Sequence, residues 1–176
     1  MNDTFIKGAD ISMLLEVEEC GGKFYDNGKQ GDLIAILKAY GINSVRLRLW
    51  VDPYSEDGHA YGAGTNDLPR TIKLAKRVKE VGLSLLLDFQ YSDFWADPGK
   101  QTMPKAWRGL SYDELNKKVF DYTGEVLDRM RNENCYPDLI QIGNEVTNGL
   151  MWPVGGEGKW ENIAGLISSG INAARA

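Results

Sequence analysis

Apolar residues recur along the chain in two alternating patterns. Apolar positions three or four residues apart are typical of an amphipathic helix, and short alternating or continuous apolar runs are typical of a strand. The helical pattern covers residues 33–40, 68–81, 111–134 and 160–174, and the strand pattern covers residues 5–10, 44–51, 83–89 and 138–143. The sequence therefore predicts strands and helices that alternate along the whole chain.

Turn and capping residues mark the ends of these elements. Gly41 and Gly82 directly follow two predicted helices, where a residue in the left-handed conformation commonly ends a helix. Ser111 and Glu114 fit the capping box that begins a helix. Pro137 blocks continuation of that helix, so the last strand begins after it.

The spacing of the strands predicts the fold class. Successive strands begin about 39, 39 and 55 residues apart, which is the rhythm of βα units with right-handed crossovers. Four such units are expected. Continuous apolar strands belong to a parallel sheet with covered faces, so this α/β chain forms either a doubly wound sheet or part of a (β/α)8 barrel.

Polar residues at the strand ends favour the barrel. They follow all four strands: Asp10, residues 46–50 with Asp52, residues 88–93, and Asn144 with Glu145. Barrel enzymes place their chemistry at this end of the strands. A doubly wound nucleotide-binding sheet would need a glycine-rich phosphate turn after the first strand, and residues 8–12 lack both that spacing and the phosphate-binding lysine.

Composition narrows the functional class. The 176 residues fit one domain, and 20 Lys and Arg against 25 Asp and Glu give a net charge of -5, which disfavours a nucleic-acid partner. No apolar run reaches the roughly 18 residues of a membrane span, so no membrane partner is expected. The first residues show no basic region followed by an apolar stretch, so a secretory signal is expected to be absent or removed.

The two cysteines and the single histidine are too few for a cysteine or histidine metal site and for a histidine-dependent catalytic triad. Cys20 and Cys135 have no Cys or His neighbour at ligand spacing, so we expect two free thiols and no metal site. The single histidine, His59, lies in a loop, which disfavours a Ser-His-Asp or Cys-His mechanism.

The strongest candidate for acid/base chemistry is Glu145. It follows the fourth predicted strand and is preceded by Asn144, whose amide can donate a hydrogen bond to a sugar hydroxyl. A carboxyl group in this place suits general acid/base catalysis of glycoside hydrolysis. The alternative is a surface charge or a helix cap at the start of the next loop.

Two arginines on the second strand require partners. Arg46 and Arg48 are two residues apart and face the same side of the sheet. An arginine there is costly to bury without a carboxylate, and Asp10, Asp88 and Glu145 are the candidates. Either arginine could instead be a purely structural member of an ion pair.

Aromatic residues gather in the same loops: Trp50, Tyr54, Phe89, Tyr91, Phe94, Trp95, Trp107 and Trp152. Flat rings beside polar side chains suit the binding of a polysaccharide. Ordinary packing is the expected role for most of them. Trp95 and Trp152 are the candidates for stacking on sugars, because polar loop residues surround them.

Four segments together resemble one known family. Residues 8–12, 45–53, 87–101 and 141–153 resemble, in order and spacing, glycoside hydrolase family 53, the arabinogalactan endo-β-1,4-galactanases. The most specific segment is Tyr-Ser-Asp-Phe-Trp-Ala-Asp-Pro at residues 91–98. The resemblance runs from Phe5 to the end of the chain.

This resemblance implies a retaining (β/α)8 enzyme without a cofactor. It implies that Glu145 is the acid/base, that a glutamate after strand seven is the nucleophile, and that Arg46 supports that nucleophile. The remaining substrate-binding candidates are Asn144, Asp88, Gln90, Trp95 and Trp152. The family usually has histidine where this chain has Gln90, which forms hydrogen bonds but carries no charge near neutral pH.

A complete barrel takes about 250 residues, so residues 1–176 are expected to be the N-terminal half of one barrel domain. The parent protein would be a secreted enzyme that cleaves galactan side chains of pectin, and the half lacking the nucleophile would be inactive alone. An apolar inner face would bind a second barrel half or a second copy. The alternatives are a non-catalytic carbohydrate-binding half-barrel and a relative that cleaves another β-linked glycan.

Overall fold

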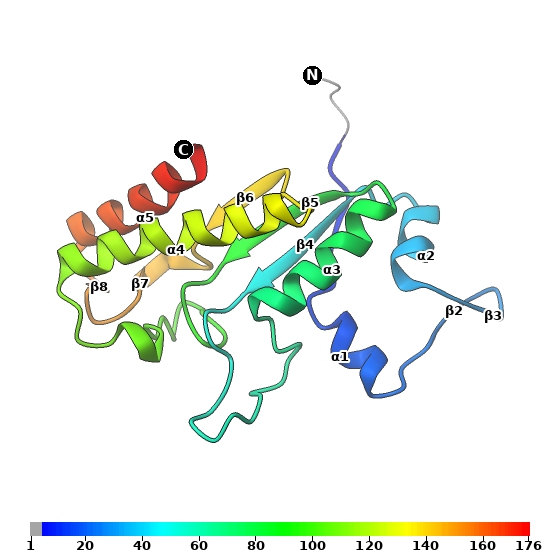
Figure 1. Cartoon of the computed structure of the whole chain (residues 1–176), viewed down its shortest axis with the longest axis horizontal. Helices are drawn as coiled ribbons and strands as arrows, with labels where there is room; N and C mark the ends of the chain where they lie inside the picture. Colours follow the sequence, from blue (N-terminus) through cyan, green and yellow to red (C-terminus); the bar gives the residue numbers. More distant parts are fainter. Residues whose placement is uncertain (1–4) are drawn as a thin grey trace.

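A parallel sheet of four strands forms the centre of the molecule. The structure is a computed structural model that describes residues 5–176. The strand order is β1 (Gly8–Asp10), β4 (Ser44–Leu49), β5 (Ser84–Phe89) and β6 (Leu139–Ile142), and every neighbouring pair is parallel (Figure 1). The predicted α/β class and the parallel sheet are confirmed.

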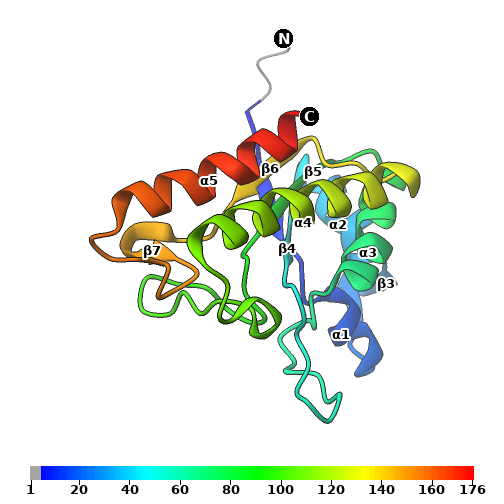
Figure 2. The ribbon, with the colours of Figure 1, turned by 60° about the vertical axis from the view of Figure 1, so that its left-hand side comes forward.

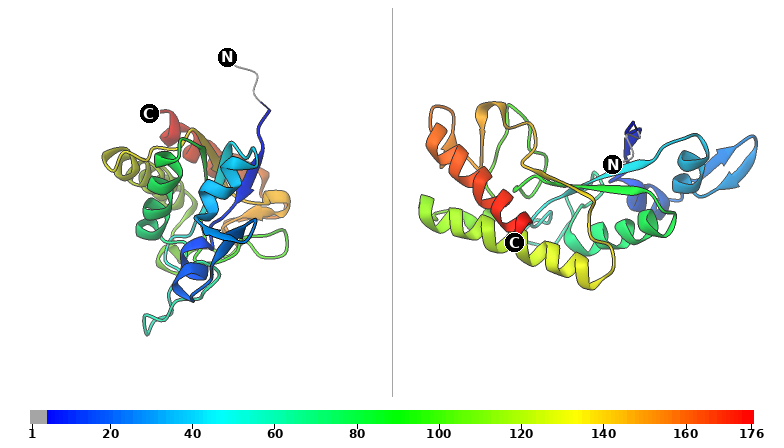
Figure 3. Two further views of the ribbon diagram at one scale, coloured as in Figure 1. Left: turned by 90° about the vertical axis from the view of Figure 1, so that its right-hand side faces the viewer. Right: turned by 90° about the horizontal axis from the view of Figure 1, so that it is seen from above.

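Three long helices lie along one face of this sheet (Figure 3). They are α3 (Leu68–Glu80), α4 (Tyr112–Asn132) and α5 (Trp160–Arg175). The predicted capping box begins α4: the Ser111 hydroxyl accepts from the Glu114 backbone N–H, and the Glu114 carboxylate accepts from the Ser111 N–H. This reciprocal pairing satisfies N–H groups at a helix start that have no partner within the helix.

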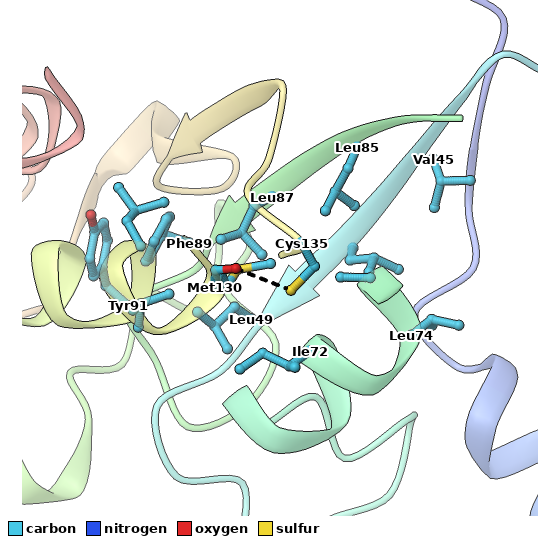
Figure 4. Packing of buried hydrophobic residues seen from close by; sticks show 14 of the residues in the cluster. Val45, Leu49, Ile72, Leu74, Leu85, Leu87, Phe89, Tyr91, Met130 and Cys135 are labelled. Carbon is cyan, nitrogen blue, oxygen red and sulfur yellow. Dashed lines mark hydrogen bonds between the residues drawn. The ribbon is translucent and has the colours of Figure 1, made fainter. Parts of the chain in front are cut away.

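The hydrophobic core lies between the sheet and the helices. Every second residue of the central strands points toward the helices and is fully buried, including Leu47, Leu49, Leu85 and Leu87 (Figure 4). Cys135 packs in the same core and its Sγ donates to the Met130 carbonyl at 3.5 Å, whereas Cys20 is exposed. Both cysteines are free, as predicted.

The opposite face of the sheet differs from the apolar surface that was expected. Paired residues in register form rows on this face. The first row is Gly8, Ser44 and Ser84; the second is Asp10, Arg46, Leu86 and Leu139; the third is Arg48, Asp88 and Gln141. Polar and charged residues therefore dominate toward the carboxyl ends of the strands, and the prediction of an apolar inner face is wrong.

Short elements complete the N-terminal part and were not predicted. Helix α1 (Leu14–Glu19) and the hairpin of β2 (Phe24–Asp26) and β3 (Lys29–Gly31) precede helix α2 (Leu33–Ala39). The hairpin projects away from the sheet (Figure 1). These pieces are too short to show a hydrophobic period in the sequence.

Strands β1 and β4 are also shorter than predicted. Strand β1 begins at Gly8 rather than Phe5, because its partner β4 begins at Ser44. Strand β4 ends at Leu49, because the N–H of Trp50 donates to Asn66 in a loop and not to a neighbouring strand. Both differences reflect the extent of strand pairing.

Long loops leave the carboxyl ends of β4 and β5 on the same side of the molecule (Figure 2). The second contains the short helix η1 (Lys105–Trp107). After β6 come η2 (Val146–Asn148), β7 (Gly149–Leu150) and β8 (Gly155–Gly156). Within residues 5–176, no helix has the length and apolar character needed to cross a membrane.

Candidate active site

Arg46 connects the carboxyl ends of all four strands. Its Nη1 donates to Asp10 on β1 at 2.7 Å, and its Nη2 donates to Asp88 on β5 at 2.6 Å. Its Nε lies 3.4 Å from Oε1 of Gln141 on β6, and Nη2 also donates to Oδ1 of Asn144 at 2.8 Å. Two of the candidate carboxylate partners, Asp10 and Asp88, therefore pair with Arg46. These contacts use four of the five guanidinium N–H groups, so one is left without a partner in the described chain.

Glu145, the third expected partner, does not pair with Arg46. Among residues 5–176, the ion pairs of Arg46 are those to Asp10 and Asp88, and the Glu145 side chain is exposed. Of the three candidate partners, Arg46 therefore pairs with the other two, Asp10 and Asp88.

Asp88 is a fully buried carboxylate beneath the site. Its Oδ2 accepts from Arg46 and from Nε2 of Gln90, whereas its Oδ1 is buried without a partner in the described structure. Burial raises the pKa of Asp88 from its usual 3.8 to about 6, and the nearby Arg46 charge opposes that rise. The Asp88 side chain is 0% exposed, and its predicted contact with substrate stays a prediction.

Gln90 lies in the same buried layer. Its Oε1 accepts from Nε1 of Trp50 at 2.8 Å and from the N–H of Ala96 at 3.2 Å, and its Nε2 donates to Asp88 at 3.1 Å. The side chain is only 2% exposed and orients other residues, and its predicted contact with substrate stays a prediction.

The turn that carries Glu145 has an unusual backbone. Glu145 has a φ of 48° and a ψ of 45°, in the left-handed region, which costs a non-glycine residue about 1–3 kcal/mol. Gln101 stabilises this turn from a buried position: its Nε2 donates to the carbonyls of Asn144 at 2.7 Å and Glu145 at 3.3 Å. Non-glycine residues held in this conformation cluster at active sites.

Asn144 is oriented by hydrogen bonds on both ends of its amide. Its Oδ1 accepts from Arg46 and from Gln141, at 2.8 and 3.2 Å, and its Nδ2 donates to the Ala96 carbonyl at 2.7 Å. An amide nitrogen carries two N–H groups. One N–H of Asn144 is therefore left for a ligand beside Glu145.

Arg48 has no carboxylate partner among the described residues. Its guanidinium carbon lies 4.1 Å from the centre of the Trp95 ring, and its Nε is buried without a hydrogen bond. Burial lowers its pKa, and the charges of Asp10 and Asp88 oppose that effect. The cation therefore rests against an aromatic face.

Trp95 and Trp152 lie in the loops that border the site, and both are partly exposed. Trp95 makes an edge contact with the buried Trp50, with ring centres 5.7 Å apart. The indole N–H of Trp152 donates to the Asn148 carbonyl at 3.0 Å. Of the other aromatic candidates, Trp50, Phe89, Tyr91 and Trp107 are buried in the packing of the molecule.

Sequence reasoning did not single out Gln101. Its backbone carbonyl accepts from the Trp152 N–H at 2.7 Å while its side chain holds the Glu145 turn, so one residue connects two loops. The only signal in the sequence is its position at the end of the specific segment after β5. Among residues 5–176, no group of three or more His, Cys, Asp or Glu side chains is arranged to hold a metal ion.

A parallel βα sheet with an ordered Asn-Glu turn and a partly exposed arginine-aspartate network at its carboxyl edge defines part of a glycoside hydrolase barrel. The chain belongs to glycosyl hydrolase family 53, whose sequence profile matches residues 6–176. It is 43% identical to an endo-beta-1,4-galactanase of Bacillus subtilis, covering 99% of this chain and 40% of that protein. It is also 43% identical to a probable arabinogalactan endo-beta-1,4-galactanase A of Neosartorya fischeri, covering 93% and 44%.

Solved structures agree with this assignment. The GH53 catalytic domain of Ignisphaera aggregans superposes with a TM-score of 0.95 at 48% identity, covering 97% of this chain and 48% of that one. A fungal beta-1,4-galactanase gives a TM-score of 0.88 at 38% identity, covering 97% and 49%. The fold is thus a partial barrel, and the chain spans about half the length of the relatives it matches.

Proposed function

We propose that residues 1–176 form the N-terminal half of one barrel domain of a retaining endo-β-1,4-galactanase, in which Glu145 is the acid/base. The observation that carries the proposal is the Asn144-Glu145 turn, which Arg46 and Gln101 hold at the carboxyl end of β6 while the Glu145 carboxyl remains exposed. The relatives named as galactanases supply the substrate class.

In the proposed reaction, a carboxylate from the other half of the barrel attacks the anomeric carbon of galactose. Glu145 donates its proton to the glycosidic oxygen as the bond to that oxygen breaks. Glu145 then accepts a proton from water, whose oxygen attacks the anomeric carbon and releases the nucleophile. This double displacement requires the two carboxyl groups to lie about 5–5.5 Å apart.

The remaining residues have supporting roles in this proposal. The free N–H of Asn144 donates to a sugar hydroxyl near the bond that is cleaved, and the faces of Trp95 and Trp152 contact sugar rings. Asp88 and Gln90 act through Arg46: they fix its guanidinium, whose remaining N–H points to the incoming nucleophile. Because the substrate is a polymer of plant cell walls, the parent enzyme acts outside the cell.

The test joins residues 1–176 to the C-terminal half of the Ignisphaera aggregans domain, whose first half this chain matches at 48% identity. We expect the chimera to release reducing sugar from β-1,4-galactan and Glu145→Gln to reduce the rate at least about 100-fold. Circular dichroism establishes that both proteins fold. A folded chimera that binds galactan without releasing sugar would favour a non-catalytic module, and release only from another β-linked glycan would overturn the substrate assignment.

The unaltered chain is measured beside the chimera. We expect no turnover from it, because the proposed acid/base has no nucleophile with which to form a covalent intermediate. Sedimentation at micromolar concentration tests the proposed pairing with a second barrel half. We expect the chain to form a complex when the separate C-terminal half is added.

A further inference from the structure

Two neighbouring cavities lie among the loops that follow β4, β5 and β6. One has a volume of about 170 Å³ and is lined by Tyr61, Phe94 and Trp95. The other, of about 290 Å³, is lined by Trp152. Thr102, Met103 and Arg108 line both cavities, so we call the pair the loop groove.

The loop groove is tied to the Glu145 turn by Gln101, the neighbour of Thr102. Gln101 binds the carbonyl of Glu145 with its side chain and the N–H of Trp152 with its own carbonyl. Thr102 forms a β-bridge with Trp152. A sugar chain that leaves the reaction centre over this turn therefore enters the groove.

The smaller cavity carries an unbalanced positive charge. Lys100, Lys105 and Arg108 line it with a single carboxylate, Asp93, although the chain as a whole has a net charge of -5. Lys105 is neutralised by Asp52, whose Oδ2 lies 2.6 Å from its Nζ. Within residues 5–176, neither Lys100 nor Arg108 forms an ion pair.

The acidic groups near these two cations are already engaged. Asp93 accepts from the backbone N–H groups of Asp52 and Lys105, at 3.1 and 2.7 Å. Asp97 accepts from the N–H of Gly99 at 2.8 Å. The Nζ of Lys100 lies over the Phe94 ring, 5.1 Å from its centre. Lys100 and Arg108 are both exposed and are thus available to bind a negatively charged ligand.

We propose that the loop groove binds a sugar unit that carries a carboxylate. The aromatic rings contact the apolar face of the sugar, and Lys100 and Arg108 bind its carboxylate. The inference rests on the proposed function and extends it: the preferred substrate has an acidic sugar next to the neutral stretch that is cleaved.

The test measures binding of a trigalacturonide and of its carboxyl-reduced derivative to the unaltered chain by titration calorimetry. The two ligands differ only in their carboxylates. We expect the acidic ligand to bind at least fivefold more tightly, and Lys100→Gln with Arg108→Gln to remove that difference. The matched control is Lys23→Gln with Lys29→Gln, which removes two exposed cations near the hairpin and should preserve it.

Equal binding of the two ligands would overturn the inference, as would an equal loss in the control variant, which would indicate general attraction by surface charge. Acetate added as a competitor distinguishes recognition of an acidic sugar from binding of any small anion. We expect acetate to compete weakly with the trigalacturonide. Full competition by acetate alone would show a plain anion site without sugar recognition. The outcome can be told apart from that of the chimera, because the calorimetry compares two ligands that differ only in their carboxylates and involves no hydrolysis.

Discussion

Replacing Asp88 by asparagine gives a direct measure of how burial and ion pairing compete in the site. Asp88 has no exposed surface, and its pKa rises from 3.8 to about 6. At about 1.36 kcal/mol per pKa unit, that rise corresponds to about 3 kcal/mol. A carboxyl group with a raised pKa in the folded state contributes its full stability below pH 3.8 and loses it as the pH rises to about 6.

The assay is urea unfolding followed by tryptophan fluorescence between pH 4 and 7.5. We expect the unfolding free energy of the unaltered chain, minus that of Asp88→Asn, to fall by about 3 kcal/mol over this range and to level off above pH 6. The exposed Asp57→Asn serves as the control and should show no such trend. A difference that rises with pH would refute the reasoning, because it would mean that attraction by Arg46 outweighs the cost of burial.

Three further predictions concern the residues around Glu145. Gln101→Leu should destabilise the turn by about 1–3 kcal/mol, seen as faster hydrogen exchange at residues 144–148, because it removes the side-chain donor of the Asn144 carbonyl, whereas the Glu145 carbonyl keeps the Thr147 N–H. Gln90→His should make folding weaken below about pH 6.5, in a thermal melt series, because imidazolium cannot accept from Trp50; a flat pH profile would contradict this. Trp95→Ala should cost about 1–2 kcal/mol in urea unfolding by exposing Arg48, and unchanged stability would show that their contact contributes nothing.

Local signals explain what could be predicted from sequence. The capping box at Ser111 and Glu114 was predicted because both partners lie within one helical turn. The pairing of Arg46 with Asp10 and Asp88 was predicted because parallel strands bring their carboxyl ends to one edge. The fold class and the four strands of the sheet can be predicted from patterns of this kind.

Features that depend on distant partners were missed. Helix α1 has six residues and is fixed to α3 by ion pairs of Glu18 with Arg77 and of Glu19 with Arg70. The direction of Glu145 depends on a left-handed backbone held by Gln101 from another loop. Neither follows from a hydrophobic period or from the alignment of parallel strands, because the partners lie on a six-residue helix and in loops.

The charged face of the sheet affects how a barrel of this kind folds during its synthesis. A ribosome delivers the first four βα units before the rest, and at that stage the face that will line the barrel is in contact with water. Arg46 pairs with Asp10 and Asp88 across three strands, and because Arg46 and Asp10 are partly exposed, this face presents charged groups to water instead of an apolar surface. An emerging half-barrel can thus hold its strand register and avoid aggregation during the interval before its complement is synthesised.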